Sequence, residues 1–222
     1  MLFAAGFGTR MAPLTDHRPK PMIPVGGRPL IDHALDQVEA YGPKRIVMNL
    51  HYLGEQIVQY LEKRPVRFSH ETPDILETGG GLRAALPLLG DAPVFTMNTD
   101  AVWRGPNPLA HLAAHWNPDI MDALLLCVPP EQAFGHTGPG DFLVDGSGLA
   151  ERGPGAIYSG LQIIKTDGLD QVEERVFSLN LLWNRMLAAR TLHAVAYPGL
   201  WCDVGTPAGL AQAETLLAET HV

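Results

Sequence analysis

The residues best suited to chemistry lie at the start of the chain, where glycines alternate with small residues. The run Phe3-Ala4-Ala5-Gly6-Phe7-Gly8-Thr9-Arg10 follows a short apolar segment. Glycines lack a Cβ and so let a phosphate approach the backbone, and successive N–H groups in such a loop converge on one anion. The planar guanidinium of Arg10 can bind two phosphate oxygens at once. This pattern predicts a loop that holds a triphosphate.

A second cation, Lys20, stands between Pro19 and Pro21. The two proline rings restrict the backbone around it. Two familiar phosphate-binding motifs match the first loop less well. A dinucleotide-binding fingerprint needs a third glycine where Met11 stands, and a Walker loop needs Gly-Lys-Ser/Thr at its end. On the loop alone, a plain structural turn remains an equal alternative.

Two aspartates stand at the ends of expected strands. Asp100 follows the apolar run 94–97, and Asp203 ends the extended piece 200–203. A carboxylate at the C-terminal tip of a parallel strand faces the ligand crevice of an open α/β sheet. For Asp100 alone, an Asx turn is the alternative. Together the two acids are suited to share one Mg²⁺, which takes one or two carboxylates plus phosphate oxygens and waters.

The elements that must position these residues alternate between strand and helix patterns. Such alternation predicts βαβ units and a mainly parallel sheet flanked by helices, a Rossmann-like α/β fold. The expected strands are 1–5, 45–50, 66–70, 94–97, 123–128 and 192–197, and the expected helices are 30–41, 54–64, 80–89, 108–116, 179–189 and 207–219.

The composition changes after Pro129. Residues 129–162 are rich in glycine, with short strand patterns at 142–144 and 156–158, and the run 161–164 can extend the second. We therefore expect a small antiparallel lobe laid over the edge of the sheet. The whole chain is expected to be one domain, 1–222, with a first half 1–128 and a closing half 129–222.

Composition and charge exclude several classes of protein. The 222 residues carry a net charge of −8 and contain no stretch of five or more Lys or Arg, which argues against nucleic acid or an anionic membrane as a partner. No apolar run approaches the roughly 20 residues of a membrane span. Cys127 and Cys202 both lie in apolar surroundings and are expected to be free thiols in the cytoplasm. The sequence leaves open a monomer or a small homo-oligomer.

The opening segment resembles the signature of the sugar-1-phosphate nucleotidylyltransferases, a family with a GT-A-like fold. That signature is Leu-Ala-Ala-Gly-x-Gly-Thr-Arg-Met, then Pro-Leu-Thr, then Pro-Lys-Pro. This chain has it as 3–11, 13–15 and 19–21. The resemblance implies that the amides around Gly6 to Thr9 hold a triphosphate, that Arg10 stabilises the pyrophosphate leaving group and that Lys20 binds the α-phosphate and the attacking phosphate.

The same resemblance assigns further residues. Asp100 and Asp203 match the two metal ligands of the family, although Thr99 stands where the family usually has glycine. The segment Glu77–Leu82 matches the one that binds the base, and a helix N-cap is the structural alternative. Nucleotide binding is thus assigned to Ala4, Ala5, Gly6, Gly8, Thr9, Arg10, Lys20, Thr78, Gly79 and Gly80, and catalysis to Arg10, Lys20, Asp100 and Asp203.

The sugar side of the resemblance is less complete. Gly140, Asp141, Ser159 and Gly160 lie where the family binds the sugar, with a hairpin turn or an edge strand as equal alternatives. Arg152 stands near the position of a lysine that holds the sugar phosphate in many relatives.

Within the family, the stretches 75–81 and 85–93 are similar to uridylyltransferases that act on N-acetylmuramate 1-phosphate in cell-wall (peptidoglycan) recycling. The resemblance implies a Mg²⁺-dependent enzyme that forms a nucleotide sugar and pyrophosphate from UTP and a sugar 1-phosphate. Two alternatives remain: a guanylyltransferase acting on mannose or heptose 1-phosphate, and a nucleotide sensor without turnover.

Overall fold

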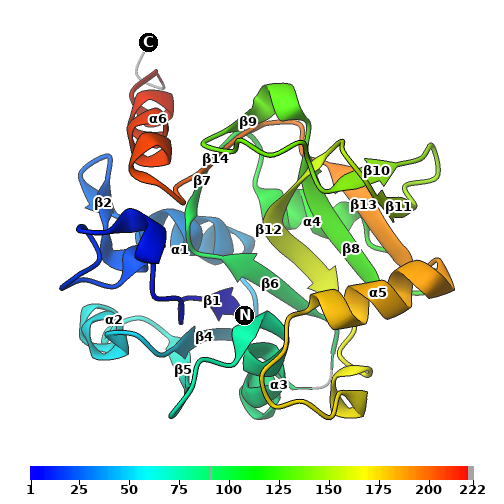
Figure 1. The fold of residues 1–222 in the computed structure, drawn as a ribbon, viewed down its shortest axis with the longest axis horizontal. Helices are drawn as coiled ribbons and strands as arrows, with labels where there is room; N and C mark the ends of the chain where they lie inside the picture. The colour runs from blue at the N-terminus through cyan, green and yellow to red at the C-terminus, as the bar shows by residue number, and fades with distance from the viewer. Residues whose placement is uncertain (91, 220–222) are drawn as a thin grey trace.

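A computed structural model describes residues 1–90 and 92–219, so Asp91, which belongs to the stretch 85–93, lies outside the described residues. A central sheet of seven strands runs through the molecule, with helices against both of its faces (Figure 1). In spatial order the strands are β13 (Leu192–Ala196), β8 (Ala123–Val128), β12 (Ile157–Ile164), β6 (Val94–Asn98), β1 (Leu2–Phe3), β4 (Ile46–Leu50) and β5 (Val66–His70).

The sheet is mainly parallel, as the alternating pattern predicts. Strands β6, β1, β4 and β5 run parallel to one another, and so do β13 and β8. Strands β4 and β8 are buried on both faces, which is typical of parallel strands covered by helices on each side. The predicted α/β fold is therefore confirmed. The carboxyl ends of β1, β4 and β6 meet at one edge of the sheet, and loops from this edge form the cleft described below.

Strand β12 lies in a different place from the one expected for its sequence pattern. The short pattern at 156–158 was expected in a lobe over the sheet edge, but β12 lies inside the central sheet, antiparallel to both β6 and β8. Seven of its eight residues are buried, because its apolar side chains meet helices on both faces. The patterns at 156–158 and 161–164 indicate the strand itself, but the glycines and prolines before Ile157 suggested the wrong place for it.

The helices cover the two faces in separate groups. On one face lie α1 (Leu30–Tyr41), α2 (Gly54–Tyr60) and α4 (Pro108–His115), which contribute to one apolar cluster. On the other face lie α3 (Glu77–Leu89) and α5 (Asn180–Ala189), which contribute to a second. None of the helices in the described residues combines the length and the apolarity needed to span a membrane.

Smaller elements complete the fold at the cleft edge. Strand β7 (Ala101–Arg104), which sequence patterns miss, pairs with β14 (Leu200–Asp203), and β14 pairs with β9 (Ala133–Phe134). The helix α6 (Pro207–Ala218) packs on this sheet and on the β2–β3 hairpin (Pro24–Val25 and Arg28–Pro29). Strands β10 (Phe142–Val144) and β11 (Ala150–Arg152) form the antiparallel hairpin that remains of the expected lobe.

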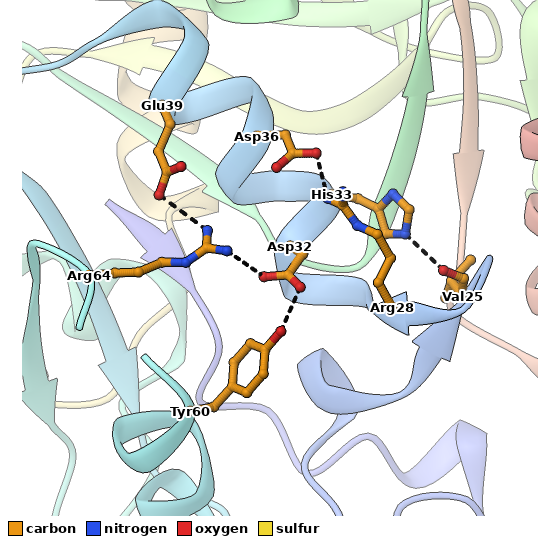
Figure 2. A network of polar contacts seen from close by, with 8 residues as sticks. All are labelled: Val25, Arg28, Asp32, His33, Asp36, Glu39, Tyr60 and Arg64. Atoms are coloured by element: carbon orange, nitrogen blue, oxygen red, sulfur yellow. Dashed lines mark hydrogen bonds and ion pairs between the residues drawn. The ribbon is translucent and has the colours of Figure 1, made fainter. Parts of the chain in front are cut away.

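A polar network fastens α1 to the end of α2 (Figure 2). The hydroxyl of Tyr60 donates to Asp32 at 2.6 Å, and this hydrogen bond raises the pKa of Tyr60. Arg64 pairs with Asp32 and with Glu39, both at 3.1 Å. Because Asp32 is nearly buried, its partners compensate the cost of removing its charge from water. The network holds together the helices of the first two crossovers, which connect β1 to β4 and β4 to β5.

Arg190, which ends α5, offers a test of backbone strain. It is exposed and has φ of +58°, the left-handed conformation that favours glycine. Replacement by glycine is expected to raise the free energy of unfolding by about 0.5–1 kcal/mol, because it removes a cost of about 1–2 kcal/mol and adds a smaller loss of chain entropy. Urea denaturation measures this change. Gly42→Ala at the end of α1, where φ is +74°, is the reciprocal control and should lower stability; a loss of stability in Arg190→Gly would contradict the prediction.

Candidate active site

The loop after β1 presents free backbone donors at the edge of the sheet. Within the described residues, no protein acceptor takes the N–H groups of Ala5, Gly6, Phe7 or Gly8. Gly8 has φ of +65°, and its carbonyl accepts from Met11 N–H at 2.9 Å and from the Thr15 hydroxyl at 3.0 Å. The loop is therefore fixed in shape while its donors stay available to an anion.

Lys20 and Asp100 meet directly. The Lys20 ammonium lies 2.7 Å from Asp100 Oδ2, although the two residues are 80 positions apart. Lys20 begins a short turn at 20–22 that is closed by hydrogen bonds from Met22 and Ile23. Thr99 secures the other side: its hydroxyl donates to Phe3 O at 2.8 Å, and it does not have positive φ. The turn therefore accommodates a threonine at position 99 without a left-handed backbone.

Asp203 lies beside Asp100. Strands β7 and β14 pair Asp203 with Ala101, and Val204 N–H donates to Asp100 O at 2.8 Å. Burial raises the pKa of Asp203, and the negative charge of Asp100 raises it further, against opposing effects of Lys20, Arg10 and His136. The antiparallel pairing of two short strands therefore brings together two acids that are far apart in sequence.

These groups surround a cleft of about 340 Å³. Its lining includes most of the residues predicted to bind nucleotide, namely Ala4, Ala5, Gly6, Gly8, Thr9, Arg10, Lys20 and Thr78, together with Asp100. Asp203 is not itself one of the lining residues, but it lies directly behind Gly205, which does line the cleft: a Cβ added to Gly205 would be 2.7 Å from Asp203 Oδ2. The phosphate loop, both cations and both acids thus gather at one place.

The structure gives Gly79 and Gly80 a different environment from the one expected. Both are buried, and their N–H groups donate to Phe177 O at 2.9 and 3.0 Å. A Cβ on Gly79 would strike the Phe177 ring, and one on Gly80 would lie 2.5 Å from Arg175 O. These glycines therefore admit the close approach of the segment 175–177, and the neighbouring Glu77 and Thr78 line the cleft in their place.

The residues predicted to bind the sugar have structural partners of their own. Asp141 accepts from Tyr158 N–H at 2.8 Å, and the buried Ser159 hydroxyl donates to Leu126 O at 2.7 Å. Gly140 has φ of +93° and lies against Gly155. Gly160, with φ of +84°, packs against Asn98, which lines the cleft.

Arg152 also has partners outside the cleft lining. Its guanidinium donates to Asn180 Oδ1 at 2.6 Å and lies over the rings of Phe142 and Trp183, at 5.2 and 5.7 Å from their centroids. The hairpin β10–β11 and the start of α5 hold the side chain in this position. Nothing in its contacts brings it to Lys20 or Asp100.

Sequence reasoning missed Asn49 and Glu71 in the cleft and His136 near Asp203. Asn49 and Glu71 line the floor of the cleft and are almost fully buried. Their signal was a polar residue at or just after the end of an apolar strand. His136, whose charge acts on Asp203, gave no signal beyond its glycine-rich setting. Glu77 has φ of +63°, a strained conformation of the kind that clusters at binding sites.

The donor set fits a divalent metal bound jointly with phosphates. Among the described residues, no group of three or more His, Cys, Asp or Glu side chains could hold a metal by itself. Two adjacent carboxylates match the protein share of a Mg²⁺ site, whose other ligands are phosphate oxygens and waters. Burial and, after it, repulsion from Asp100 raise the pKa of Asp203, and a divalent cation would relieve the repulsion.

The fold and this cleft together define a nucleotidyltransferase. Comparison with known proteins gives the family: the model of the MobA-like NTP transferase domain matches residues 1–198. The chain therefore belongs to the MobA-like NTP transferase family.

The most informative of the similar proteins align with almost the full length of this chain. An N-acetylmuramate alpha-1-phosphate uridylyltransferase of Caulobacter vibrioides is 37% identical over 99% of this chain and 96% of its own length. One from Neisseria meningitidis serogroup B is 35% identical, over 97% and 96%. Mannose-1-phosphate guanyltransferases also match, at 29% identity or less. The fold resembles that of HddC from Yersinia pseudotuberculosis complexed with GMP-PN, with a TM-score of 0.77, 21% identity and 97% coverage of both chains.

Gly6 allows the phosphate-loop interpretation to be tested without disturbing the fold. A Cβ at this position would meet no protein atom within 4 Å, and Gly6 lines the cleft. Gly6→Val is expected to unfold at nearly the wild-type temperature and to weaken nucleotide binding at least about tenfold, the effect of losing one or two charged hydrogen bonds. Titration calorimetry with a nucleoside triphosphate measures the affinity; wild-type affinity in the variant would show that no phosphate approaches this loop.

Proposed function

We propose that this protein transfers a uridylyl group from UTP to N-acetylmuramate 1-phosphate, giving a UDP-sugar and pyrophosphate. The observation that supports this most directly is the meeting of Lys20, Asp100 and Asp203 beside a glycine-rich loop with free N–H donors. The choice of substrates is supported by the two uridylyltransferases that match nearly the full chain.

In the proposed reaction, an oxygen of the sugar 1-phosphate attacks the α-phosphorus of UTP in line, and pyrophosphate leaves. The attacking group is already an anion near neutral pH, so positioning and charge neutralisation carry the catalysis. The loop amides hold the triphosphate, Arg10 stabilises charge on the leaving pyrophosphate, and Lys20 lies between the α-phosphate and the attacking phosphate. The loop and Lys20 are held in place before the substrates bind, and fixed groups of this kind stabilise a transition state most effectively.

Asp100 and Asp203 would hold the Mg²⁺ ion. When bound, such an ion neutralises charge on the phosphate oxygens and orients them. In its absence Lys20 provides the counter-charge of Asp100.

The nucleoside is proposed to lie toward the start of α3. The first N–H groups of a helix have no partner within it. Those of Gly79 and Gly80 donate to Phe177 O, whereas those of Glu77 and Thr78 have no protein acceptor within the described residues, and both of these residues line the cleft. The sugar is proposed to lie past Asn98, toward Gly160 and the β10–β11 hairpin. The two free buried cysteines support a cytoplasmic protein.

A substrate panel tests this function. UTP, TTP, GTP, CTP and ATP are each combined with N-acetylmuramate 1-phosphate, N-acetylglucosamine 1-phosphate or mannose 1-phosphate, with Mg²⁺, and pyrophosphate release is measured. UTP with N-acetylmuramate 1-phosphate is expected to give the highest kcat/KM. Preference for GTP with mannose 1-phosphate would instead favour a guanylyltransferase, and binding of nucleotide without pyrophosphate release from any pair would indicate a sensor.

A further inference from the structure

Two buried polar side chains on the floor of the cleft, Asn49 and Glu71, have no part in the mechanism above. Their exposed fractions are 3% and 1%. Asn49 belongs to the carboxyl end of β4, and Glu71 follows β5 directly. A buried carboxylate is costly unless hydrogen bonds replace its water. Its partners therefore indicate what the side chain is for.

The two side chains form a continuous hydrogen-bond relay. Ala4 N–H donates to Asn49 Oδ1 at 2.9 Å, Asn49 Nδ2 donates to Glu71 Oε1 at 2.7 Å, and Leu76 N–H donates to Glu71 Oε2 at 2.6 Å. The backbone donors at both ends fix the polarity, because Ala4 needs an acceptor and so turns the Asn49 nitrogen toward Glu71. Both oxygens of the Glu71 carboxylate are therefore acceptors.

The relay joins the two parts of the proposed nucleotide site. Ala4 opens the phosphate loop, and Leu76 directly precedes Glu77 and Thr78, where the nucleoside is proposed to lie. Gly81 makes room for the junction, since a Cβ there would lie 2.5 Å from Glu71 Oε1 and 3.0 Å from Asn49 Nδ2.

The Glu71 carboxylate forms no ion pair within the described residues. Its charge is held by N–H donors alone, which are directional and set distances more strictly than a mobile lysine would. This favours a positioning role over simple charge compensation.

We propose that Asn49 and Glu71 are positioning residues that set the distance between the phosphate loop and the segment 76–78, and through it the fit of the nucleotide. This inference rests on the proposed function. If the relay is broken, the two ends of the nucleotide no longer fit together, so binding of UTP weakens and discrimination between UTP and CTP falls. The sugar 1-phosphate is proposed to lie past Asn98, away from both ends of the relay, so its KM is expected to stay unchanged.

Each single substitution breaks the relay in a defined way. Glu71→Gln sets an amide N–H group against either Asn49 Nδ2 or Leu76 N–H, so that two donors face each other. Asn49→Asp sets two carboxylates against each other. Each is expected to raise the KM for UTP at least about tenfold, since displacement of a bound group by an ångström can cost about 10²-fold in rate.

The double variant N49D/E71Q should restore the relay with its charge moved by one residue. The carboxylate introduced at position 49 then accepts from Ala4 N–H and from the amide nitrogen introduced at position 71, and the amide oxygen at position 71 accepts from Leu76 N–H. The net charge is the same as in the wild type, and each of the three hydrogen bonds of the relay again joins a donor to an acceptor. The KM for UTP is expected to return to within about threefold of wild type, the kind of coupling that double-mutant cycles detect between residues in contact.

Tyr197→Phe is the matched control, because it removes a buried hydrogen bond to Pro106 O, 2.8 Å long, away from the cleft. It should lower the unfolding temperature and leave both KM values unchanged. Should Glu71→Gln fail to fold, Asn49→Ser breaks the same junction and takes its place.

The proposal is overturned if the single variants lose stability as Tyr197→Phe does but keep the wild-type KM for UTP. It is also overturned if the folded double variant stays as impaired as the singles. Titration calorimetry with UTP is run on the same proteins. If the wild type releases no pyrophosphate, the proposed function fails, whereas the calorimetric pattern still decides the role of the relay.

Discussion

Asp100→Asn is expected to lower the rate of pyrophosphate release at saturating substrates by at least about 10²-fold, the range for removal of one fixed electrostatic group. The substitution keeps the shape of the side chain but removes the charge that faces Lys20 and lies beside Asp203. The measurement is a continuous pyrophosphate assay with UTP, N-acetylmuramate 1-phosphate and Mg²⁺.

The control for this variant is Asp122→Asn. Asp122 pairs with Lys165 at 2.9 Å, close to the 2.7 Å of the Lys20–Asp100 pair, but it lies at the amino end of β8, across the sheet from the cleft. Its loss should leave turnover nearly unchanged. Normal turnover in Asp100→Asn would remove this carboxylate from the proposed metal site.

Lys20→Met is expected to lower the same rate by at least about 10²-fold, because the ammonium group is placed to neutralise charge on the reacting phosphates. A second readout distinguishes this role from a structural one. In the free protein Lys20 holds Asp100, so a divalent cation must compete with the ammonium group. The variant should therefore bind Mn²⁺ more tightly than the wild type when no nucleotide is present.

Lys165→Met serves as the control, since it removes the cation of an ion pair outside the cleft. It should change neither turnover nor Mn²⁺ affinity. Weaker Mn²⁺ binding in Lys20→Met would mean that Lys20 supports the acid pair in the resting protein, and the competition described here would be wrong.

Local patterns were sufficient to predict most of the main sheet and helices. Strands such as β8 are continuous apolar runs, and helices such as α1 have apolar residues at helical spacing; glycine or proline bounds both kinds of segment. These patterns can be recognised from neighbouring residues alone. Strand β12 could be seen only in part, because its place between β6 and β8 depends on residues more than about thirty positions away. The sequence of a strand does not specify which other strands it pairs with.

The residues of the candidate site also differ in whether a local sequence pattern predicts their position. Loop residues such as Gly6, Gly8 and Arg10 form one local motif, and the structure places them in the cleft as expected. The run Gly79–Gly80 was expected at the base, yet its open space is occupied by Phe177, a residue that no local pattern connects with it. Asn49 and Glu71 look ordinary in sequence and acquire meaning only when β4 and β5 align their ends.

The position of β12 has a consequence for synthesis on the ribosome. Strands β6 and β8 are translated first, and the strand that separates them follows at residues 157–164. Until it emerges, the nascent chain exposes one unpaired edge of β6 and both edges of β8, because β13, the other neighbour of β8, is translated later still. Such edges can capture another polypeptide. A chain truncated near residue 128 would keep these unpaired edges, so translation that stalls there is expected to yield aggregates. For the same reason, cleavage of the chain at this point is not expected to give two fragments that fold independently.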